Sequence, residues 1–449
     1  MRSKLTLLLA LLTCTLGLAQ TLEPKPTDPH LQQFKPLKAP QPRGVVLRRG
    51  DRLAICGDSI TEQKMYSRLI EDYLTVCEPE LKVTVRQYGW GGERAPGFLA
   101  RMTNDCLRFK PTIATTCYGM NDHEYRSYEE RIGQTYRENS TAIVQAFKAN
   151  GVRVIQGSPG CVGKVPGWQK RTNDTVVDLN LNLCQLRNIG VEIAEKQRVG
   201  FADVLWPMLT AGTAAQKRYG ADYAIAGKDG VHPGWAGHTV MAYAFLKAFG
   251  LKGDIGLFTV DVKKSKMKAS RGHKVLSARG GEFQLQSSRY PFCACVPAGQ
   301  AAASYPECDK DNPEKDNSIR SGLTLIPFDQ DLNRLVLKAK NTQAGHNYKV
   351  TWGQESKTFS AAQLEHGINL VAEFPCNSFC EAFAKVDAAV AAKQAYDTTQ
   401  IKKTFRSPEA KTDMEGVAAR TEQERGPLAA AIKATFVPVT HTIKVEAVK

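Results

Sequence analysis

A serine, an aspartate and a histidine in this sequence have the types and spacing that nucleophilic catalysis requires. Ser59 follows Gly57 and Asp58 and directly precedes a helical pattern, and Asp229 stands three residues before His232. A serine hydroxyl needs a base to take its proton, and a carboxylate fixes the tautomer of that base and stabilises its charged form. A D-x-x-H turn can supply the last two groups from one short segment. The three residues are therefore candidates for a nucleophile, a base and an orienting carboxylate.

Both motifs also have a simpler structural interpretation. Serine is an ordinary N-cap at the start of a helix, and a loop histidine can simply be bonded to a nearby aspartate. His238 is a competing base six residues after His232, but it falls in a helical pattern with no acidic residue close upstream. We therefore assign the role of base to His232.

Two turns could supply the hydrogen-bond donors that a developing oxyanion requires. Residues 89–92 read Gly-Trp-Gly-Gly and follow the second predicted strand, and residues 119–122 read Gly-Met-Asn-Asp and follow the third. A glycine lets a backbone N–H approach a site closely, and Asn121 offers its side-chain amide. Each turn is common on its own. Their order along the chain is more informative. The ends of three successive predicted strands carry, in turn, the candidate nucleophile and the two candidate donor turns.

Residues 51–250 alternate between strand and helix patterns. The predicted strands cover 52–57, 82–88, 112–117, 152–156 and 201–205, and the predicted helices cover 61–76, 128–149, 176–196 and 235–249. This alternation predicts an α/β domain with a parallel sheet covered by helices on both faces. The carboxyl ends of the strands then share one edge, where reactive groups gather in such sheets. We expect the candidate residues to meet at that edge.

The chain of 449 residues is long for one core, so a second domain is expected. A proline-rich lead-in at 20–50 precedes the α/β domain at 51–250. Residues 251–449 read as a mostly β domain that carries a helical insertion. Its predicted strands are 257–262, 274–277, 335–339, 348–352, 370–374 and 441–448, and its helical, charged stretch is 379–433.

The first residues have the pattern of a secretory signal peptide. Arg2 and Lys4 precede an apolar run at 5–12, and small residues at 17 and 19 predict cleavage between Ala19 and Gln20. The alternative is a retained membrane anchor. No later stretch approaches the roughly 20 apolar residues of a transmembrane helix. We therefore expect a secreted or periplasmic protein with residues 1–19 removed.

The net charge of +15 raises the possibility of a nucleic-acid partner. One dense basic run is present, but it lacks interleaved aromatic residues and a recognition motif, so we interpret it as solvated surface and expect no nucleic-acid partner. The run consists of Lys263, Lys264, Lys266, Lys268, Arg271 and Lys274.

Twelve cysteines include Cys14 in the predicted signal peptide, which leaves eleven in the mature chain. An oxidising compartment makes some disulfides plausible. Cys56 and Cys117 stand in apolar strand patterns, which is typical of buried free thiols. No paired C-x-x-C and no histidine cluster accompanies the cysteines, so we expect no metal site.

Four short segments together resemble a known family. Gly57-Asp58-Ser59-Ile60, the glycine after the second strand, Gly119-x-Asn121-Asp122 and Asp229-x-x-His232 are similar to blocks I, II, III and V of the SGNH (GDSL-type) hydrolases. The resemblance covers about residues 51–250. It implies a flavodoxin-like αβα three-layer domain that hydrolyses esters through an acyl-enzyme and needs no cofactor.

The resemblance also implies a role for each matching residue. Ser59 would be the nucleophile and first oxyanion donor, His232 the base and Asp229 its orienting carboxylate. Asn121 would be the side-chain donor of the oxyanion hole. Gly92 matches the block II glycine best because an acidic residue follows it. Gly91 stays open as the alternative.

The predicted secretion and the appended β-rich domain favour a small ester or an acetylated glycan as substrate, and hence a carbohydrate O-deacetylating esterase. A lipase or lysophospholipase is the alternative among enzymes. A glycan-binding module that keeps the fold without catalysis is the alternative from another class. Trp90 and His123 stand next to the oxyanion turns and are candidate substrate-binding residues, whereas Glu62 and Lys64 are expected at the surface.

Overall fold

A five-stranded parallel sheet forms the centre of the first half of the protein. The computed structural model describes residues 21–169, 173–295 and 314–448, so the predicted signal peptide at 1–19 lies outside the described residues. The strand order β2-β1-β3-β4-β5 is that of flavodoxin-like folds and confirms the predicted fold class. The strands are β1 (Arg52–Gly57), β2 (Thr84–Gln87), β3 (Ile113–Cys117), β4 (Arg153–Gly157) and β5 (Gly200–Ala202).

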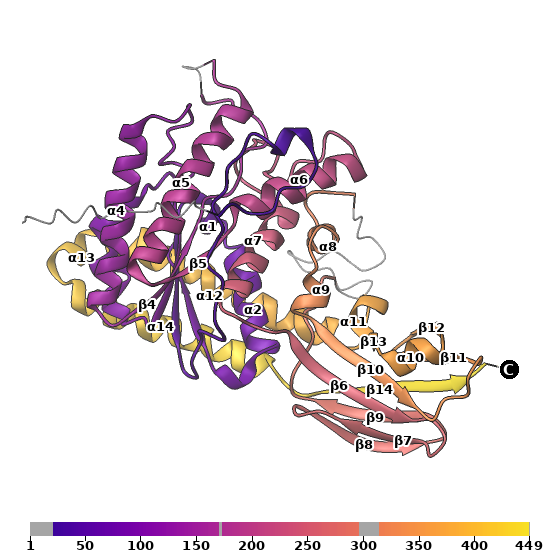
Figure 1. Cartoon of the computed structure of the whole chain (residues 1–449). Coiled ribbons are helices and arrows are strands. Elements are labelled where there is room, and N and C mark those ends of the chain that lie inside the picture. Colours follow the sequence, from indigo (N-terminus) through magenta and orange to yellow (C-terminus); the bar gives the residue numbers. More distant parts are fainter. Residues whose placement is uncertain (1–20, 170–172, 296–313, 449) are drawn as a thin grey trace, which may run out of the picture.

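Helices cover both faces of this sheet (Figure 1). Alternate residues of β1 explain why, since Leu53 and Ile55 join one hydrophobic cluster and Ala54 and Cys56 join another. The first cluster contains α2 (Tyr66–Val76) and α7 (Trp235–Ala248), and the second contains α3 (Ala95–Asp105), α4 (Glu130–Ala149) and part of α5 (Val176–Gln197). Strands buried on both faces read as continuous apolar runs, which is why the sequence predicted them well. A further helix, α6 (Leu205–Tyr219), packs between α5 and α7.

Two smaller sheets form the β-rich part of the chain, at the lower right of Figure 1. One has the strand order β13-β10-β6-β7 and the other β12-β11-β14-β9-β8. Their strands are β6 (Asp254–Asp261), β7 (Lys266–Ala269), β8 (His273–Arg279), β9 (Glu282–Ser287), β10 (Arg334–Lys340), β11 (Asn347–Trp352), β12 (Glu355–Ser360), β13 (Ile368–Asn369) and β14 (Val439–Ala447). One continuous hydrophobic cluster includes Tyr73 of α2, Phe258 of β6 and Trp352 of β11, so the α/β and β-rich parts share a core.

The C-terminal helices lie against the α/β sheet, although they follow the β-rich strands in sequence (yellow in Figure 1). They are α12 (Cys380–Lys402), α13 (Pro408–Thr412) and α14 (Met414–Thr435). The helix α12 packs on α2 and on the edge strand β2. The predicted helical insertion is therefore present, but it packs with the α/β part before the chain returns to the β-rich part as β14.

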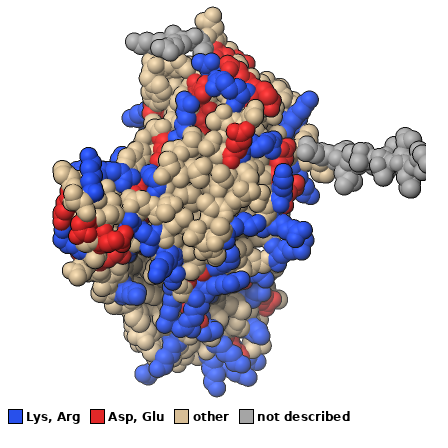
Figure 2. Space-filling model, turned by 90° about the vertical axis from the view of Figure 1, so that its left-hand side faces the viewer, with Lys and Arg blue, Asp and Glu red and all other residues tan. Residues whose placement is uncertain are grey.

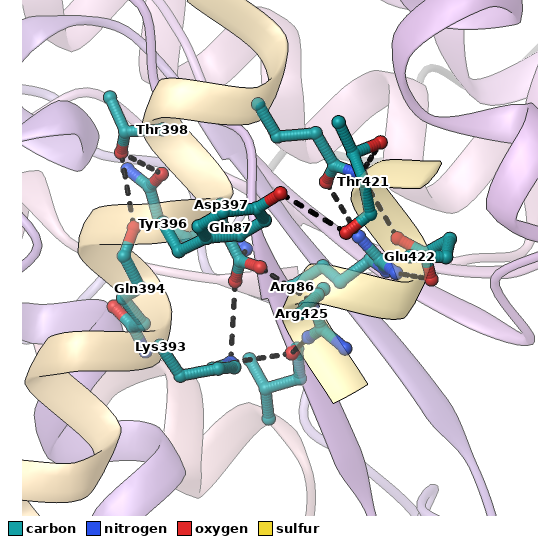
Figure 3. Close-up of polar contacts among 12 residues, drawn as sticks. Arg86, Gln87, Lys393, Gln394, Tyr396, Asp397, Thr398, Thr421, Glu422 and Arg425 are labelled. Atoms are coloured by element: carbon teal, nitrogen blue, oxygen red, sulfur yellow. Dashed lines mark hydrogen bonds and ion pairs between the residues drawn. The ribbon is translucent and has the colours of Figure 1, made fainter. Parts of the chain in front are cut away.

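The helices α12 and α14 cover the free edge of the sheet at β2 (Figure 3). The backbone oxygen of Val85 accepts hydrogen bonds from Lys393 Nζ at 2.6 Å and Arg425 Nη2 at 2.9 Å. The backbone N–H of Gln87 donates to Asp397 Oδ2 at 3.4 Å. These side chains satisfy backbone groups of an edge strand that would otherwise be open to pairing with another chain.

Two predicted elements differ from the structure. The predicted helix 61–76 is broken, since α1 (Ser59–Glu62) and α2 are separated by a turn in which Lys64 adopts a φ of 58°. The predicted strand 370–374 is instead the short helix α11 (Leu370–Glu373). Periodicity does not distinguish a strand from a helical turn in such a short apolar run.

The lead-in is tightly packed for an extended segment. Phe34 is buried against Trp206 of α6, with ring centroids 6.4 Å apart. Asn188 of α5 donates to the backbone oxygen of Lys35 at 2.9 Å. Within the described residues, no helix is long and apolar enough to cross a membrane.

The basic run lies on the surface, and two of the cysteines are buried in the α/β sheet. All six side chains of the basic run are exposed, as expected for solvated surface. Figure 2 shows Lys and Arg side chains spread over the lower part of one face of the molecule. Cys56 and Cys117 are free and buried, as predicted, whereas Cys295 is disulfide-bonded.

Candidate active site

Ser59 is the first residue of α1, directly after the tight turn that follows β1, and it is not the residue that caps the helix. The cap is Asp58, whose Oδ1 accepts the N–H of Ile60 at 3.0 Å. The turn requires glycine at position 57, because a Cβ there would lie 2.0 Å from Thr61 Oγ1. The N-cap interpretation of Ser59 is therefore wrong, and its hydroxyl is left for another partner.

The structure brings Ser59, His232 and Asp229 together. Ser59 Oγ lies 2.8 Å from His232 Nε2, and His232 Nδ1 lies 2.7 Å from Asp229 Oδ2. The other carboxylate oxygen, Oδ1, accepts the backbone N–H groups of Val231 and His232, both at 2.9 Å. Partial burial raises the pKa of Asp229, but these hydrogen bonds outweigh it and hold the pKa below its ordinary value. The carboxylate is thus ionised and fixed in position for a histidine that becomes positively charged.

His238 is placed where it cannot act as the base. It is fully buried in α7, its Nδ1 faces the backbone N–H of Tyr66 at 3.2 Å, and its Nε2 faces Gln63 Oε1 at 3.2 Å. Burial lowers its pKa to about 3. The ring is neutral and bonded on both sides, which supports the choice of His232.

Asn121 is held by hydrogen bonds on both sides of its amide. Its Nδ2 donates to the backbone oxygen of Glu93 at 3.0 Å, and its Oδ1 accepts from the hydroxyl of Tyr125 at 3.0 Å. An amide nitrogen carries two hydrogens. Both contacts fix the amide plane and leave the second hydrogen for an oxyanion.

The two candidate glycines differ in what their N–H groups contact. The N–H of Gly91 donates to Glu62 Oε2. Gly92 follows with a φ of 71°, in the left-handed region that glycine adopts readily. Since the Gly91 donor is already taken, Gly92 is the better candidate for the oxyanion donor. Glu62 was expected at the surface, but its side chain is only 24% exposed, and it bonds Gly91 and pairs with Lys402.

Buried carboxylates connect the loops behind the site. Asp122 Oδ1 accepts the N–H of Ala95, and Oδ2 accepts that of Gly119, both at 2.9 Å. Burial raises the pKa of Asp122 to about 6 despite these two donors. Glu93 pairs with Arg101 through two hydrogen bonds of 2.6 and 2.7 Å. The turns that carry Asn121 and Gly92 are therefore rigidly connected.

The two residues predicted to bind substrate, His123 and Trp90, are both engaged by other parts of the protein. His123 is fully buried, its Nδ1 faces the backbone oxygen of Met120, and burial lowers its pKa to about 4. The ring of Trp90 is half-buried among three cations, with centroid distances of 5.0 Å to Arg101, 5.2 Å to Lys402 and 5.1 Å to Arg406. Trp90 thus holds the C-terminal helices against the sheet, and His123 is no contact surface for a substrate in this conformation.

Two aromatic residues border the site, and sequence reasoning missed one of them, Trp168. Trp168, in the loop after β4, lies with its ring centroid 6.2 Å from that of His232 and is 51% exposed. Tyr125 lies between Trp168 and Asn121. Both follow strand ends at the predicted edge of the sheet, and that position was the signal available in the sequence.

Within the parts of the chain that the structure describes, no group of three His, Cys, Asp or Glu side chains could hold a metal ion. Ser59, His232 and Asp229 are arranged as a proton relay. A flavodoxin-like sheet with such a relay at the carboxyl ends of its strands has the arrangement of a serine hydrolase.

The α/β domain is similar to a known family of hydrolases. Residues 55–240 match the model of the GDSL-like Lipase/Acylhydrolase family. None of the curated proteins matches the chain.

Solved structures with a similar fold include a gut microbial diltiazem-metabolizing enzyme, with a TM-score of 0.67 and 21% identity over 90% of this chain and 99% of that one. Because the match includes the C-terminal part, the whole-chain architecture recurs in another protein. Two further matches have lower TM-scores. An alpha/beta hydrolase from the metagenome of Lake Arreo in Spain has a TM-score of 0.37 and 22% identity, over 46% of this chain and 98% of that one. An acetylxylan esterase from Geobacillus stearothermophilus has a TM-score of 0.37 and 22% identity, over 46% of this chain and 96% of that one.

Proposed function

We propose that this protein is a secreted serine esterase that removes small acyl groups, acetyl above all, from a carbohydrate. The observation that carries the proposal is the continuous relay from Ser59 Oγ through His232 to Asp229, with distances of 2.8 and 2.7 Å. Secretion is inferred from the N-terminal sequence pattern.

The geometry supports a two-step reaction. Ser59 Oγ attacks the ester carbonyl carbon while its proton passes to His232 Nε2, and Asp229 stabilises the imidazolium that forms. The oxyanion receives hydrogen bonds from the N–H groups of Ser59 and Gly92 and from Asn121 Nδ2. Collapse breaks the bond to the alcohol oxygen, which takes the proton from His232. Water activated by His232 then releases the acid and restores Ser59.

The surroundings of the relay favour a ring-bearing alcohol over a lipid. Trp168 is the exposed large apolar side chain that contacts the relay. Other exposed large apolar side chains lie elsewhere in the sequence, in the lead-in or in the C-terminal part: Leu22, Val45, Leu257, Leu276, Val437 and Val448. A long acyl chain would gain from contiguous aliphatic surface, whereas a flat indole suits a ring.

A panel of esters tests the proposal. The purified protein is expected to release acetate from acetylated xylan or acetylated monosaccharides faster than it hydrolyses long-chain p-nitrophenyl esters, and Ser59→Ala is expected to abolish both activities. A preference for long chains would favour the lipase alternative. Equal rates for the wild type and Ser59→Ala would overturn the esterase assignment and favour a binding module.

A further inference from the structure

Trp168 is positioned to touch the part of a substrate that lies next to His232. Its ring centroid is 6.2 Å from that of His232, with the two planes inclined by 50°. Half of its surface is exposed, so one face of the ring is open to a ligand. Ligand sites are lined mainly by hydrophobic and aromatic side chains, and an aromatic face beside a reactive group fits such a lining.

Neighbouring residues hold the Trp168 loop in place. The Trp168 ring stands edge-on to Tyr125, at 5.8 Å between centroids and 86° between planes. The next residue, Gln169, donates from Nε2 to the backbone oxygen of Tyr125 at 2.8 Å, and its N–H donates to the backbone oxygen of Pro166 at 2.9 Å. The indole is therefore oriented before any ligand arrives, which lowers the entropic cost of binding.

The backbone around Tyr125 is strained in a way that serves this arrangement. Glu124 and Tyr125 have φ values of 55° and 54°, a left-handed conformation that is unfavourable for two consecutive residues with side chains. Such strain persists where surrounding contacts maintain it, and it is concentrated at functional sites. Here it places the Tyr125 ring between Asn121, which its hydroxyl contacts, and Trp168, which its ring contacts.

The mechanism defines which part of a substrate lies on this side. His232 must deliver its proton to the oxygen of the departing alcohol, so the alcohol lies next to the imidazole. We infer that Trp168 is a substrate-binding platform on which the alcohol portion of the ester, a pyranose ring, stacks with its flat face. This inference rests on the proposed function and extends it to the residue that selects the alcohol.

Polar groups beside Tyr125, which contacts Trp168, favour a sugar over a plain aromatic ring. Glu124, which precedes Tyr125, forms ion pairs with Arg94 at 3.1 Å and with Arg131 at 2.8 Å. Arg94 is 48% exposed on its side chain. A ring with hydroxyl groups can bond to this polar rim while its C–H face rests on the indole, whereas a benzene ring would leave the rim unbonded.

Two variants and three acetate esters test the platform. The variants are Trp168→Ala, which removes the flat face, and Trp168→Phe, which keeps a smaller one. The substrates are an acetylated methyl xyloside, phenyl acetate and ethyl acetate, which has no ring. We expect Trp168→Ala to lower kcat/KM for the xyloside about tenfold, mainly through KM, and to leave ethyl acetate within about twofold. Trp168→Phe should recover most of the loss.

Other outcomes overturn the inference. An equal loss on ethyl acetate would show that Trp168 acts through His232 and not through the alcohol. A loss on phenyl acetate that exceeds the loss on the xyloside would show that the platform selects aromatic alcohols. The matched control is Val437→Ala, which trims a side chain that is 54% exposed in the C-terminal part and should change none of the rates.

A binding measurement separates this inference from the proposed function. In Ser59→Ala protein, saturation transfer from the protein to the ring protons of the acetylated xyloside should be detectable. It should be lost when Trp168→Ala is added. If wild-type protein fails to turn over any ester, the proposed function fails while the binding result still decides the platform. If turnover depends on Ser59 but saturation transfer persists in the Trp168→Ala variant, the inference about the platform is overturned while the proposed function stands.

Discussion

Lys402, near the end of α12, forms an ion pair with Glu62, three residues after Ser59. The same carboxylate accepts the N–H of Gly91, directly before the candidate oxyanion donor Gly92. Lys402 and Glu62 are both about three-quarters buried, at 28% and 24% side-chain exposure, so water screens the pair only partly. A helix from the far end of the chain thus holds a loop of the candidate site.

Lys402→Met should therefore reduce catalysis without weakening substrate binding. We expect kcat on p-nitrophenyl acetate to fall about tenfold with little change in KM, because a displaced donor affects the transition state more than the ground state. Lys402→Arg should recover part of the rate. Lys403→Met is the matched control, since Lys403 is the exposed neighbour. Equal kcat values for Lys402→Met and the control would contradict the coupling.

Tyr125→Phe tests how the oxyanion amide is oriented. Without the hydroxyl, Asn121 Oδ1 loses its donor at 3.0 Å, and the amide can rotate. A single neutral hydrogen bond corresponds to a loss of about two- to tenfold in kcat. Asn121→Ala removes the donor itself and should cost about 10²- to 10³-fold. If steady-state kinetics show no change for either variant, Asn121 does not stabilise the oxyanion.

The buried ion network at β2 predicts a large stability effect (Figure 3). Lys393 is 1% exposed and pairs with Glu71 at 2.7 Å and Asp397 at 3.3 Å. Asp397→Ala would leave buried cations underpaired, and we expect it to lower the free energy of unfolding by about 3 to 5 kcal/mol. Glu381→Ala breaks an exposed pair on the same helix and should cost well under about 1 kcal/mol. Urea denaturation of both variants provides the comparison, and similar losses would contradict the account.

A buried hydrogen-bond relay among side chains of the five-stranded sheet β12-β11-β14-β9-β8 predicts sensitivity to acid. Trp352 Nε1 donates to His441 Nδ1 at 3.2 Å, so His441 Nε2 carries the hydrogen toward Ser287 Oγ at 2.9 Å. Ser287 in turn lies 2.7 Å from His273 Nδ1. This pattern needs both histidines neutral, and burial, with a smaller effect from His273, lowers the pKa of His441 to about 3.

Because the folded pKa of His441 lies below the unfolded value of about 6.5, the unfolded state binds more protons between these values. The stability is complete above about pH 6.5 and is lost as the pH falls toward 3. We expect His441→Asn to reduce the slope of unfolding free energy against pH by at most about 1.4 kcal/mol per pH unit. Thermal denaturation from pH 7 to 4 measures this slope. An unchanged slope would contradict the relay.

The α/β sheet and the relay residues could be predicted from the sequence because their signals are local. Strands buried on both faces read as apolar runs, and the D-x-x-H turn that contains Asp229 and His232 is only four residues long. The position of α12 could not be predicted in this way. Its contacts join residues more than 300 positions apart, such as Val85 and Lys393, and a helical pattern does not reveal its partner.

Substrate-binding residues were the hardest to predict. Trp90 belongs to the Gly-Trp-Gly-Gly turn at residues 89–92, and its place in a candidate oxyanion turn suggested a contact with the ligand. In the structure, cations from distant helices surround its ring. Trp168 has no motif beside it, and its position depends on how a long loop folds back toward His232. Exposure and contacts, not sequence distance, distinguish the two tryptophans.

The central claim is that Ser59 is the nucleophile, and covalent trapping tests it most directly. The protein is mixed with p-nitrophenyl acetate, quenched in acid within a turnover and digested for peptide mass spectrometry. We expect an acetyl group on Ser59 in the wild type and none in Ser59→Ala. Acetyl on a different residue, together with unchanged turnover in Ser59→Ala, would contradict the account.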